Sequence, residues 1–377
     1  MSKEIIFLGG EDVSARIEIT KKIIEKGYNV SIIGTQSEGV FKKENIKYTK
    51  YSLNRELNLF NDIKTIFELR RIFKSYKKPV IIHAFDTKPT MLLPLAAVGL
   101  KNIFVTRTIT GIGRIFTEKS FKNSVLKFIY EIIQKIVGRN VKHTIFQNDD
   151  DSNYFITSNL VKKSNSSVIK SSGIDLEKFN NESIKDNSSL INEINIDEDY
   201  ITCIMVSRMV RQKGVLDYLE AAKKCVEKEC KINFLLVGQL DTKKDSIKLE
   251  DINKYKQYVK YLGKRSDIKE LLSLSNIFVL PTFYREGVPR VLLEASAMGL
   301  ALIATNMPGC KDVVKDGVNG LLVNIKDSDD LHNKIIQVSK DKLKLEEYSK
   351  NSKEHVKNFD LNIVIEKYLE VFNKVKD

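Results

Sequence analysis

The chain has 377 residues, of which 42% are hydrophobic, and a formal net charge of +13. This hydrophobic fraction excludes a disordered protein, and the length allows two or three domains with cores of their own. Residues 1–180 hold 30 basic and 18 acidic residues (net +12), against 32 and 31 (net +1) in residues 181–377. Such a basic half favours an anionic partner, which could be a phosphorylated substrate, an anionic membrane surface or nucleic acid. The alternative is a lysine-rich composition spread over ordinary solvated surfaces.

No segment predicts export or a membrane span. Met1 leads almost directly into an apolar run at 5–8, without a signal peptide, and the longest uncharged apolar stretch, 91–100, is about half of what a span requires. We therefore expect a cytoplasmic chain. The four cysteines lack metal-ligand spacing and are expected to be small buried side chains in a reducing compartment: Cys203, Cys225, Cys230 and Cys310.

Short apolar runs typical of strands alternate with amphipathic segments of helix length along the whole chain. The expected strands of the first half are 5–8, 29–34, 79–83, 103–106 and 141–147. Those of the second half are 200–207, 232–238, 258–263, 277–281, 300–305 and 320–323. This alternation predicts an α/β fold of doubly wound, Rossmann-like domains, in which helices cover both faces of parallel sheets.

A polar stretch at 180–199 breaks this pattern once and is typical of a linker. It predicts an N-terminal domain over 1–179, a C-terminal domain over 200–358 and a last helix at 359–377 that packs back toward the N-terminal domain. Two such domains facing one another would place the carboxyl ends of both sheets around a shared cleft, where ligands of these folds bind.

Two groups of polar residues in the second half indicate a ligand. Arg208 and Lys213 lie between an expected strand and a helix, whose N-terminus adds N–H donors. This combination suits a diphosphate, although a lysine before a helix is also common without one. Glu286 follows another strand, and Glu294 lies in the helix that Pro289 starts. A carboxylate among apolar helix neighbours suits a ribose diol, and the alternative is a solvent-facing glutamate.

These residues belong to an ordered set of motifs, namely the basic pair Arg208 and Lys213, LGKRSD at 262–267, the E-x7-E pair, PGCKDVV at 308–314 and GVNGLLV at 317–323. With this set the whole chain resembles the retaining group 1 glycosyltransferases (family 4) of the GT-B fold. Within them it is similar to the bacterial branch that acts on lipid-linked oligosaccharides, capsule or O-antigen repeats. The resemblance implies a hexosyltransferase that moves a hexose or N-acetylhexosamine from a nucleotide sugar, with UDP expected, to a saccharide on undecaprenyl diphosphate.

The resemblance also implies roles for individual residues. Arg208 and Lys213 would stabilise the leaving nucleoside diphosphate, Glu286 would face the donor sugar, and His83 would meet that sugar from the first domain. For His83 the alternative is a structural histidine at a strand end. The implied donor-binding residues are Gly9, Gly10, Arg265, Glu286, Gly287, Val288 and Glu294. The implied acceptor-binding residues are Thr110, Gly111 and Gly113.

No cofactor or metal is expected. The triplet Asp149–Asp151 contains a D-x-D pattern, which holds a metal in another glycosyltransferase fold, but here it follows Asn148 at an expected helix start, so capping explains it better. Arg208 and Lys213 would then replace the cation, and the leaving phosphate would help to deprotonate the acceptor in a front-face attack. Pro289 stands where many relatives have a glycine and lacks an N–H, so the identity of the donor sugar cannot be transferred from them.

Two basic segments, 64–78 and 114–139, combine aromatic and aliphatic residues with lysines and arginines. They could lie at the anionic inner face of the cell membrane, near a lipid-linked acceptor, or they could be crossover helices whose apolar faces pack on the sheet. Two other functions stay open. A non-hydrolysing sugar-nucleotide epimerase shares this architecture, and the basic half could bind nucleic acid, although no nucleic-acid module is visible.

Overall fold

The computed structural model describes residues 4–54, 58–113, 116, 120–180, 187–241 and 246–375. They form two compact units, the first of Met1–Gly173 with Leu361–Asp377 and the second of Ile174–Asp360. The sequence predicts these boundaries at 179 and 359. The chain thus leaves the first unit earlier than expected, and its last helix belongs to the first unit.

The first unit is built on a seven-stranded parallel sheet of order β3-β2-β1-β4-β5-β6-β7. Its strands are β1 (Glu4–Leu8), β2 (Val30–Gly34), β3 (Lys47–Lys50), β4 (Val80–Ala84), β5 (Ile103–Ile109), β6 (His143–Phe146) and β7 (Ser166–Val168). The strand order reverses between β1 and β4. In open α/β sheets, ligands bind outside the carboxyl ends of the strands at such a reversal.

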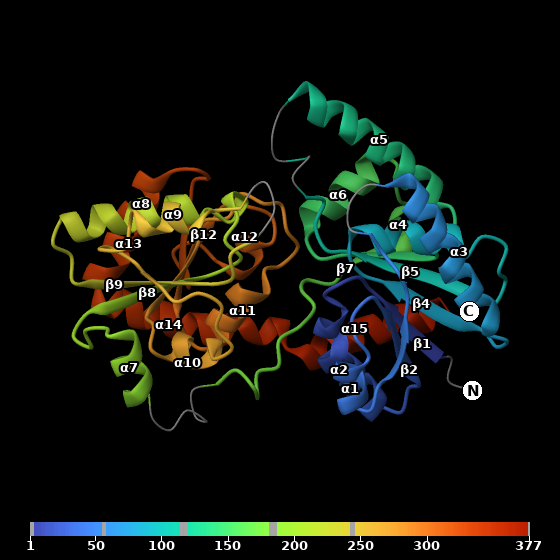
Figure 1. The fold of residues 1–377 in the computed structure, drawn as a ribbon, viewed down its shortest axis with the longest axis horizontal. Coiled ribbons are helices and arrows are strands. Elements are labelled where there is room, and N and C mark those ends of the chain that lie inside the picture. Colours follow the sequence, from blue (N-terminus) through green and yellow to red (C-terminus); the bar gives the residue numbers. More distant parts are fainter. Residues whose placement is uncertain are drawn as a thin grey trace. The chain divides into compact units, whose positions relative to one another are not determined.

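Helices cover both faces of this sheet. They are α1 (Ile17–Glu25), α2 (Gly39–Lys43), α3 (Leu59–Ser75), α4 (Thr87–Ala96), α5 (Phe121–Gly138), α6 (Asp149–Thr157) and α15 (Leu361–Lys374). Figure 1 shows α15 beside α1, although they come from opposite ends of the chain. Along β1, Ile5 and Phe7 join one core with α15, whereas Ile6 and Leu8 join a second core with α3 and α4. Burial on both faces explains the continuous apolar runs of the central strands.

The second unit contains a six-stranded parallel sheet of order β10-β9-β8-β11-β12-β13, which reverses between β8 and β11. Its strands are β8 (Ile201–Val206), β9 (Ile232–Val237), β10 (Lys260–Tyr261), β11 (Ile277–Leu280), β12 (Ala301–Thr305) and β13 (Gly320–Val323). Its helices are α7 (Ser188–Ile194), α8 (Val215–Glu227), α9 (Leu249–Asn253), α10 (Ile268–Ser273), α11 (Arg290–Ala297), α12 (Cys310–Val313), α13 (Ser328–Lys340) and α14 (Lys342–Val356).

The prediction of two doubly wound parallel α/β domains is confirmed. The sequence analysis missed β3 and β7, which are edge strands with the polar sequences KYTK and SSV. The predicted linker at 180–199 needs correction, because it contains α7. Leu190 and Ile194, one helical turn apart, are buried in the core of the second unit. Residues 181–186 of that linker lie outside the described residues.

Candidate functional site

The connection from β8 to α8 holds Lys213 close to the loop that follows β11. It forms a short 3-10 helix, Arg211–Lys213, and then turns at Gly214, whose φ is 74°. A Cβ at Gly214 would lie 2.1 Å from the Pro281 carbonyl oxygen, so only glycine fits this turn. The Phe283 N–H donates to the Gln212 carbonyl at 2.9 Å, which ties the two loops together.

Lys213 and Glu286 form an ion pair at the point where the strand order reverses. The Lys213 Nζ lies 2.6 Å from the Glu286 Oε1, and the side chains are only 14% and 19% exposed. The Thr282 hydroxyl oxygen lies 3.3 Å from the same oxygen and 3.1 Å from the Gln212 carbonyl oxygen. Two residues that the sequence places in separate motifs therefore meet at the carboxyl ends of β8 and β11, where a ligand is expected.

The loop that carries Glu286 rests on the start of α12. Gly309 has a φ of 82°, and a Cβ there would lie 1.6 Å from the Gly287 carbonyl oxygen. Val288 packs against the core of the second unit, and Pro289 is the N-cap of α11. These contacts fix the backbone of the loop before any ligand binds.

Glu294 lies one turn beyond Arg290 on α11, and its Oε1 accepts a hydrogen bond from the Arg290 Nε at 3.0 Å. The Glu294 side chain is 14% exposed, so it is not the solvent-facing glutamate of the alternative interpretation. The oxygens of this partly buried carboxylate can accept hydrogen bonds from hydroxyl groups.

The two arginines of the predicted donor site have carboxylate partners of their own. The Arg208 guanidinium, 56% exposed, lies 3.3 Å from the Asp241 Oδ2. Arg265 donates twice to Asp267, at 2.8 and 2.6 Å, and also to Glu193 of α7. These hydrogen bonds raise the pKa of the Arg265 guanidinium and lower the pKa of Asp267. Arg265 thus lies beyond the edge strand β10, away from the β8–β11 reversal.

In the first unit, Gly9 and Gly10 follow β1 and use their N–H groups within the protein. Gly9 donates to the Ile33 carbonyl and Gly10 to the Asp86 Oδ2, each at 3.0 Å. A Cβ at Gly9 would lie 2.7 Å from a methyl carbon of Val13, so this glycine makes room for Val13.

His83 is fully buried, and the prediction that it meets the donor sugar is wrong for this structure. Its Nδ1 and Nε2 each lie 2.8 Å from a threonine hydroxyl, those of Thr106 and Thr108. The rings of Tyr368 and Phe372, from α15, cover it. Burial holds the pKa of His83 well below its ordinary value. His83 is thus a neutral histidine whose two ring nitrogens are hydrogen-bonded within the protein. This matches the alternative interpretation, a structural histidine at a strand end.

Two of the three predicted acceptor residues line a common cavity. Thr110 and Gly111, which follow β5, line a cavity of only about 10 Å³, room for about one water molecule, together with Asp86 and Tyr130. Gly113 is not among the described residues that line it. Asp86 was missed by the sequence analysis, although an acidic residue directly after a strand and before a helix is a recognisable signal.

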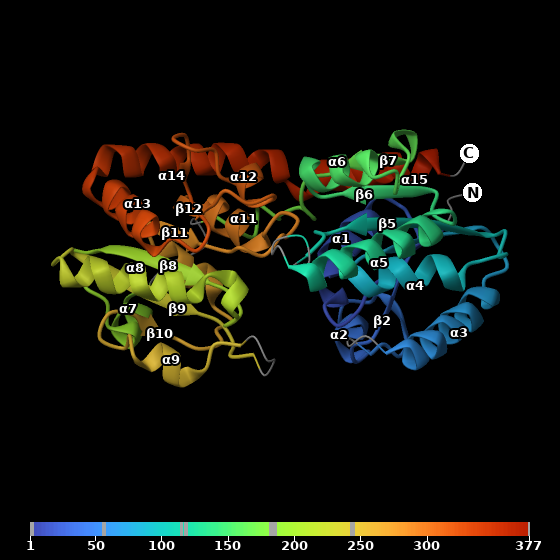
Figure 2. The same ribbon diagram turned by 90° about the horizontal axis from the view of Figure 1, so that it is seen from above.

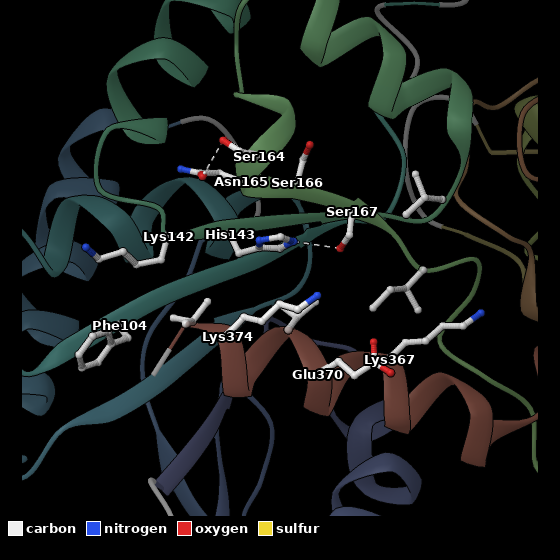
Figure 3. A pocket seen from close by; sticks show the side chains of 14 residues that line it. Phe104, Lys142, His143, Ser164, Asn165, Ser166, Ser167, Lys367, Glu370 and Lys374 are labelled. Atoms are coloured by element: carbon white, nitrogen blue, oxygen red, sulfur yellow. Dashed lines mark hydrogen bonds between the residues drawn. The ribbon is translucent and has the colours of Figure 1, made fainter. Parts of the chain in front are cut away.

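A larger cavity of about 590 Å³ lies elsewhere in the first unit, between α15 and the strands β5 to β7 (Figure 3). Lys142, Lys367 and Lys374 line it, and the His143 Nε2 lies 3.0 Å from the Ser167 hydroxyl. None of the predicted site residues is among the described residues that line this cavity. It is therefore separate from the candidate site.

The acidic triplet begins α6 behind an N-cap at Asn148, as predicted. The Asn148 side chain accepts a hydrogen bond from the Asp151 N–H at 2.8 Å, and all three aspartates lie in the first turn. No group of three histidine, cysteine, aspartate or glutamate side chains suited to a metal ion occurs in the described segments. The four cysteines, all in those segments, are free thiols, three of them buried and Cys230 partly exposed.

The comparisons with known proteins decide the family. Residues 4–148 match the model described as "Glycosyl transferase 4-like", and residues 186–355 match "Glycosyl transferases group 1". The chain is 31% identical over 366 residues to the N,N'-diacetylbacillosaminyl-diphospho-undecaprenol alpha-1,3-N-acetylgalactosaminyltransferase of Campylobacter jejuni, covering 96% of this chain and 95% of that protein. The chain belongs to the group 1 glycosyltransferases. This glycosyltransferase is a hexosyltransferase, and the family does not favour the epimerase or nucleic-acid alternatives.

Two further comparisons agree with this family assignment. The glycosyltransferase is 30% identical over 322 residues to the UDP-Gal:alpha-D-GlcNAc-diphosphoundecaprenol alpha-1,3-galactosyltransferase of Escherichia coli, covering 83% and 79% of the two chains. The structure of Anabaena Alr3699/HepE in complex with UDP and glucose superposes with a TM-score of 0.80 at 18% identity, covering 99% and 100%. That likeness shows the GT-B fold. In the part of the glycosyltransferase that the structure describes, no helix has the length and apolar character of a membrane span.

Proposed function

We propose that this glycosyltransferase moves a hexose or N-acetylhexosamine, with retention of configuration, from a UDP-sugar to a saccharide on undecaprenyl diphosphate, as a step in surface polysaccharide or glycan synthesis. The names of the two relatives support this acceptor, and the UDP complex of the Anabaena structure supports the nucleotide. The single observation that carries the proposal is the Lys213–Glu286 pair at the strand-order reversal of the second unit.

Lys213 and Arg208 are the proposed ligands of the donor diphosphate. An ammonium group has three N–H donors, and Lys213 gives one to Glu286, so the others are available to phosphate oxygens. Charge builds up on the diphosphate as the sugar leaves, and a fixed cation stabilises that charge most in the transition state. This supports a mechanism in which the two side chains take the place of a metal ion.

Glu286 is proposed to position the donor sugar, because its carboxylate is held by Lys213 and Thr282 at the same place. Glu294 is proposed to accept hydrogen bonds from the ribose hydroxyls. In a front-face reaction the acceptor oxygen bonds to the anomeric carbon as the bond to the phosphate oxygen breaks, and the leaving phosphate takes the acceptor proton. The protein then contributes orientation and charge rather than a nucleophile. The remaining proposed donor contacts are Gly9, Gly10, Arg265, Gly287 and Val288.

A transfer assay tests this function. The purified chain is incubated with UDP-galactose, UDP-glucose and their N-acetylated forms, with an undecaprenyl-diphosphate-linked monosaccharide or disaccharide, in the presence and absence of EDTA. We expect release of UDP that requires the acceptor, a lengthened lipid-linked product with an α linkage, and no loss of rate in EDTA. Turnover of the UDP-sugar to an epimer without an acceptor would contradict the proposal, as would complete inhibition by EDTA.

We also propose that the first unit binds the inner face of the membrane through α5, supported by α3. All of α5 is described, and only Gln134 and Val137 of its 18 residues are buried. Its exposed large apolar side chains are Phe121, Val125, Phe128, Ile129, Ile132, Ile133 and Ile136. Lys122, Lys127 and Lys135 lie among them. A helix that combines an exposed apolar surface with lysines matches an anionic bilayer interface.

Helix α3 adds to this surface. It lies beside α4, and α4 lies beside α5 (Figure 2). Leu69 and Phe73 of α3 pack on the sheet, as expected of a crossover helix, whereas Phe60 and Phe67 are 67% and 68% exposed. Phe67 therefore points away from the packed face of this crossover helix.

Vesicle sedimentation tests the membrane proposal. We expect binding to vesicles with anionic lipids that falls as salt rises, and loss of binding in the double variant Phe128→Ser/Ile132→Ser. Ile363→Ser on α15, which removes a side chain that is 44% exposed, is the matched control and should bind like the wild type. Absence of binding at any salt concentration would contradict the proposal.

A further inference from the structure

We infer that Asp86 binds a hydroxyl group of the acceptor saccharide in the first unit. This assignment rests on the proposed function, since it needs a sugar as the acceptor. Asp86 follows β4 directly and begins α4, at the point where β4 lies between β1 and β5 in the sheet.

The backbone of Asp86 has an unusual conformation. Its φ of 69° and ψ of 156° fall in a region that is nearly confined to glycine and costs about 1–3 kcal/mol for other residues. An aspartate that begins a helix normally accepts a hydrogen bond from an N–H of the first turn. Within the described residues, the Asp86 side chain makes no such bond to α4. A structural cap therefore does not account for the aspartate.

The carboxylate instead points toward the loop that follows β1. The Gly10 N–H donates to the Asp86 Oδ2 at 3.0 Å. A Cβ at Gly10 or Gly9 would reach ordinary van der Waals contact with that oxygen, at 3.7 and 3.4 Å, so the carboxylate lies directly against the loop that these glycines form. The strained backbone thus holds the carboxylate where the strand order reverses, which is the usual ligand position in such sheets.

Asp86 also lines the small cavity beside the predicted acceptor residues Thr110 and Gly111, whose volume of about 10 Å³ has room for a single hydroxyl-sized group and not for a whole sugar ring. An ionised carboxylate accepts about four hydrogen bonds and donates none. Gly10 provides one donor, and sugar hydroxyls are suited to provide others. A carboxylate beside a threonine hydroxyl and a glycine is therefore suited to the hydroxyl groups of a sugar.

Two variants separate binding from structure. Asp86→Gly removes the carboxylate and relieves the backbone strain, so we expect a melting temperature equal to or above that of the wild type. Asp86→Asn keeps an oxygen for the Gly10 N–H but loses the charge. For both we expect the KM of the lipid-linked acceptor to rise about 10- to 100-fold, while the dissociation constant of UDP stays within twofold. Asn159→Gly, another non-glycine residue with positive φ (53°), is the matched control and should keep the wild-type KM.

The outcomes are distinct. An acceptor KM like that of the wild type in both Asp86 variants would overturn the inference, as would an equal weakening of UDP binding. A rise in the acceptor KM in Asp86→Gly alone would support the inference without a need for the charge, because the amide oxygen of Asp86→Asn can still accept a hydrogen bond from a hydroxyl. Failure of the proposed function would show differently, as a wild-type enzyme that binds UDP but transfers to no lipid-linked saccharide.

Discussion

The two units reverse their strand order in the same way but place different chemistry at the reversal. In the second unit, Lys213 and Glu286 bring opposite charges together at a rigid pair of loops. In the first unit, the same position carries two glycines, a threonine and one carboxylate, and the nearby His83 is buried and neutral. A site with a cation suits a diphosphate, and a carboxylate suits the hydroxyl groups of a sugar. The fold supplies the position, and the residues at the loops decide which substrate it takes.

The largest expected effect comes from removing the cation of the second unit. Lys213→Ala should lower kcat/KM about 10²- to 10³-fold, because one fixed donor to a developing negative charge is worth about 3–4 kcal/mol. Lys224→Ala is the matched control, since Lys224 also forms an ion pair, with Asp329 at 2.8 Å, on α8 of the same unit. Steady-state kinetics measures both, and an equal loss in the two variants would show that Lys213 has no special role.

A second test asks whether the rigid loop matters as well as the charge. In Gly309→Ala the new Cβ would collide with the Gly287 carbonyl oxygen, so we expect a loss of about 1–3 kcal/mol in unfolding free energy together with weaker UDP binding. Gly317→Ala is the control, because Gly317 has a φ of 73° but, apart from its chain neighbours, no atom within 4 Å of the position that a Cβ would take. It should cost about 1 kcal/mol of backbone strain and leave UDP binding unchanged. Equal UDP affinities in the two variants would contradict this explanation.

The neutral histidine of the first unit predicts a pH dependence of stability. Burial lowers the pKa of His83, so the folded protein binds fewer protons than the unfolded chain below about pH 6.5. His83 therefore lowers the unfolding free energy as the pH falls, by up to about 1.4 kcal/mol per pH unit. His83→Gln should show a shallower loss of stability in denaturant titrations between pH 7 and pH 5, while transfer at neutral pH is retained. An equal slope in both proteins would contradict the burial of His83.

The smallest effect concerns the acidic triplet of the first unit. Asn148→Ala removes the N-cap of α6 and should lower the unfolding free energy by about 1 kcal/mol. If the triplet only begins a helix, the variant should keep its kcat and its indifference to EDTA. A loss of activity that added Mg²⁺ or Mn²⁺ restores would instead favour a metal site in the first unit.

The central strands and the Lys213–Glu286 site could be predicted from the sequence because their signals are local. Apolar runs mark β1, β4 and β8, and the spacing of the motifs places each charged residue directly after a strand. The edge strands β3 and β7 carry no such signal, since polar residues there face solvent. The cap at Asn148 was likewise visible in the sequence.

The surroundings of His83 could not be predicted, because they depend on residues far away in the chain. The Thr108 hydroxyl beside His83 lies 3.0 Å from the Tyr368 hydroxyl, which comes from α15 at the other end of the sequence. The position of Asp86 between a strand and a helix was visible in the sequence, but the geometry of its side chain was not. Its positive φ and its contact with Gly10 are properties of the folded loops and leave no periodic pattern in the sequence.

The central claim is that the second unit binds the donor diphosphate through Lys213 without a metal ion. Calorimetric titration with UDP is the most direct test of this claim. The wild type, Lys213→Ala and Lys224→Ala are titrated in EDTA. We predict that UDP binds the wild type and Lys224→Ala alike, and that Lys213→Ala weakens binding about 10- to 100-fold, which corresponds to about 1.4–2.8 kcal/mol. Equal affinity in all three proteins, or binding by the wild type only after a divalent metal is added, would contradict the account.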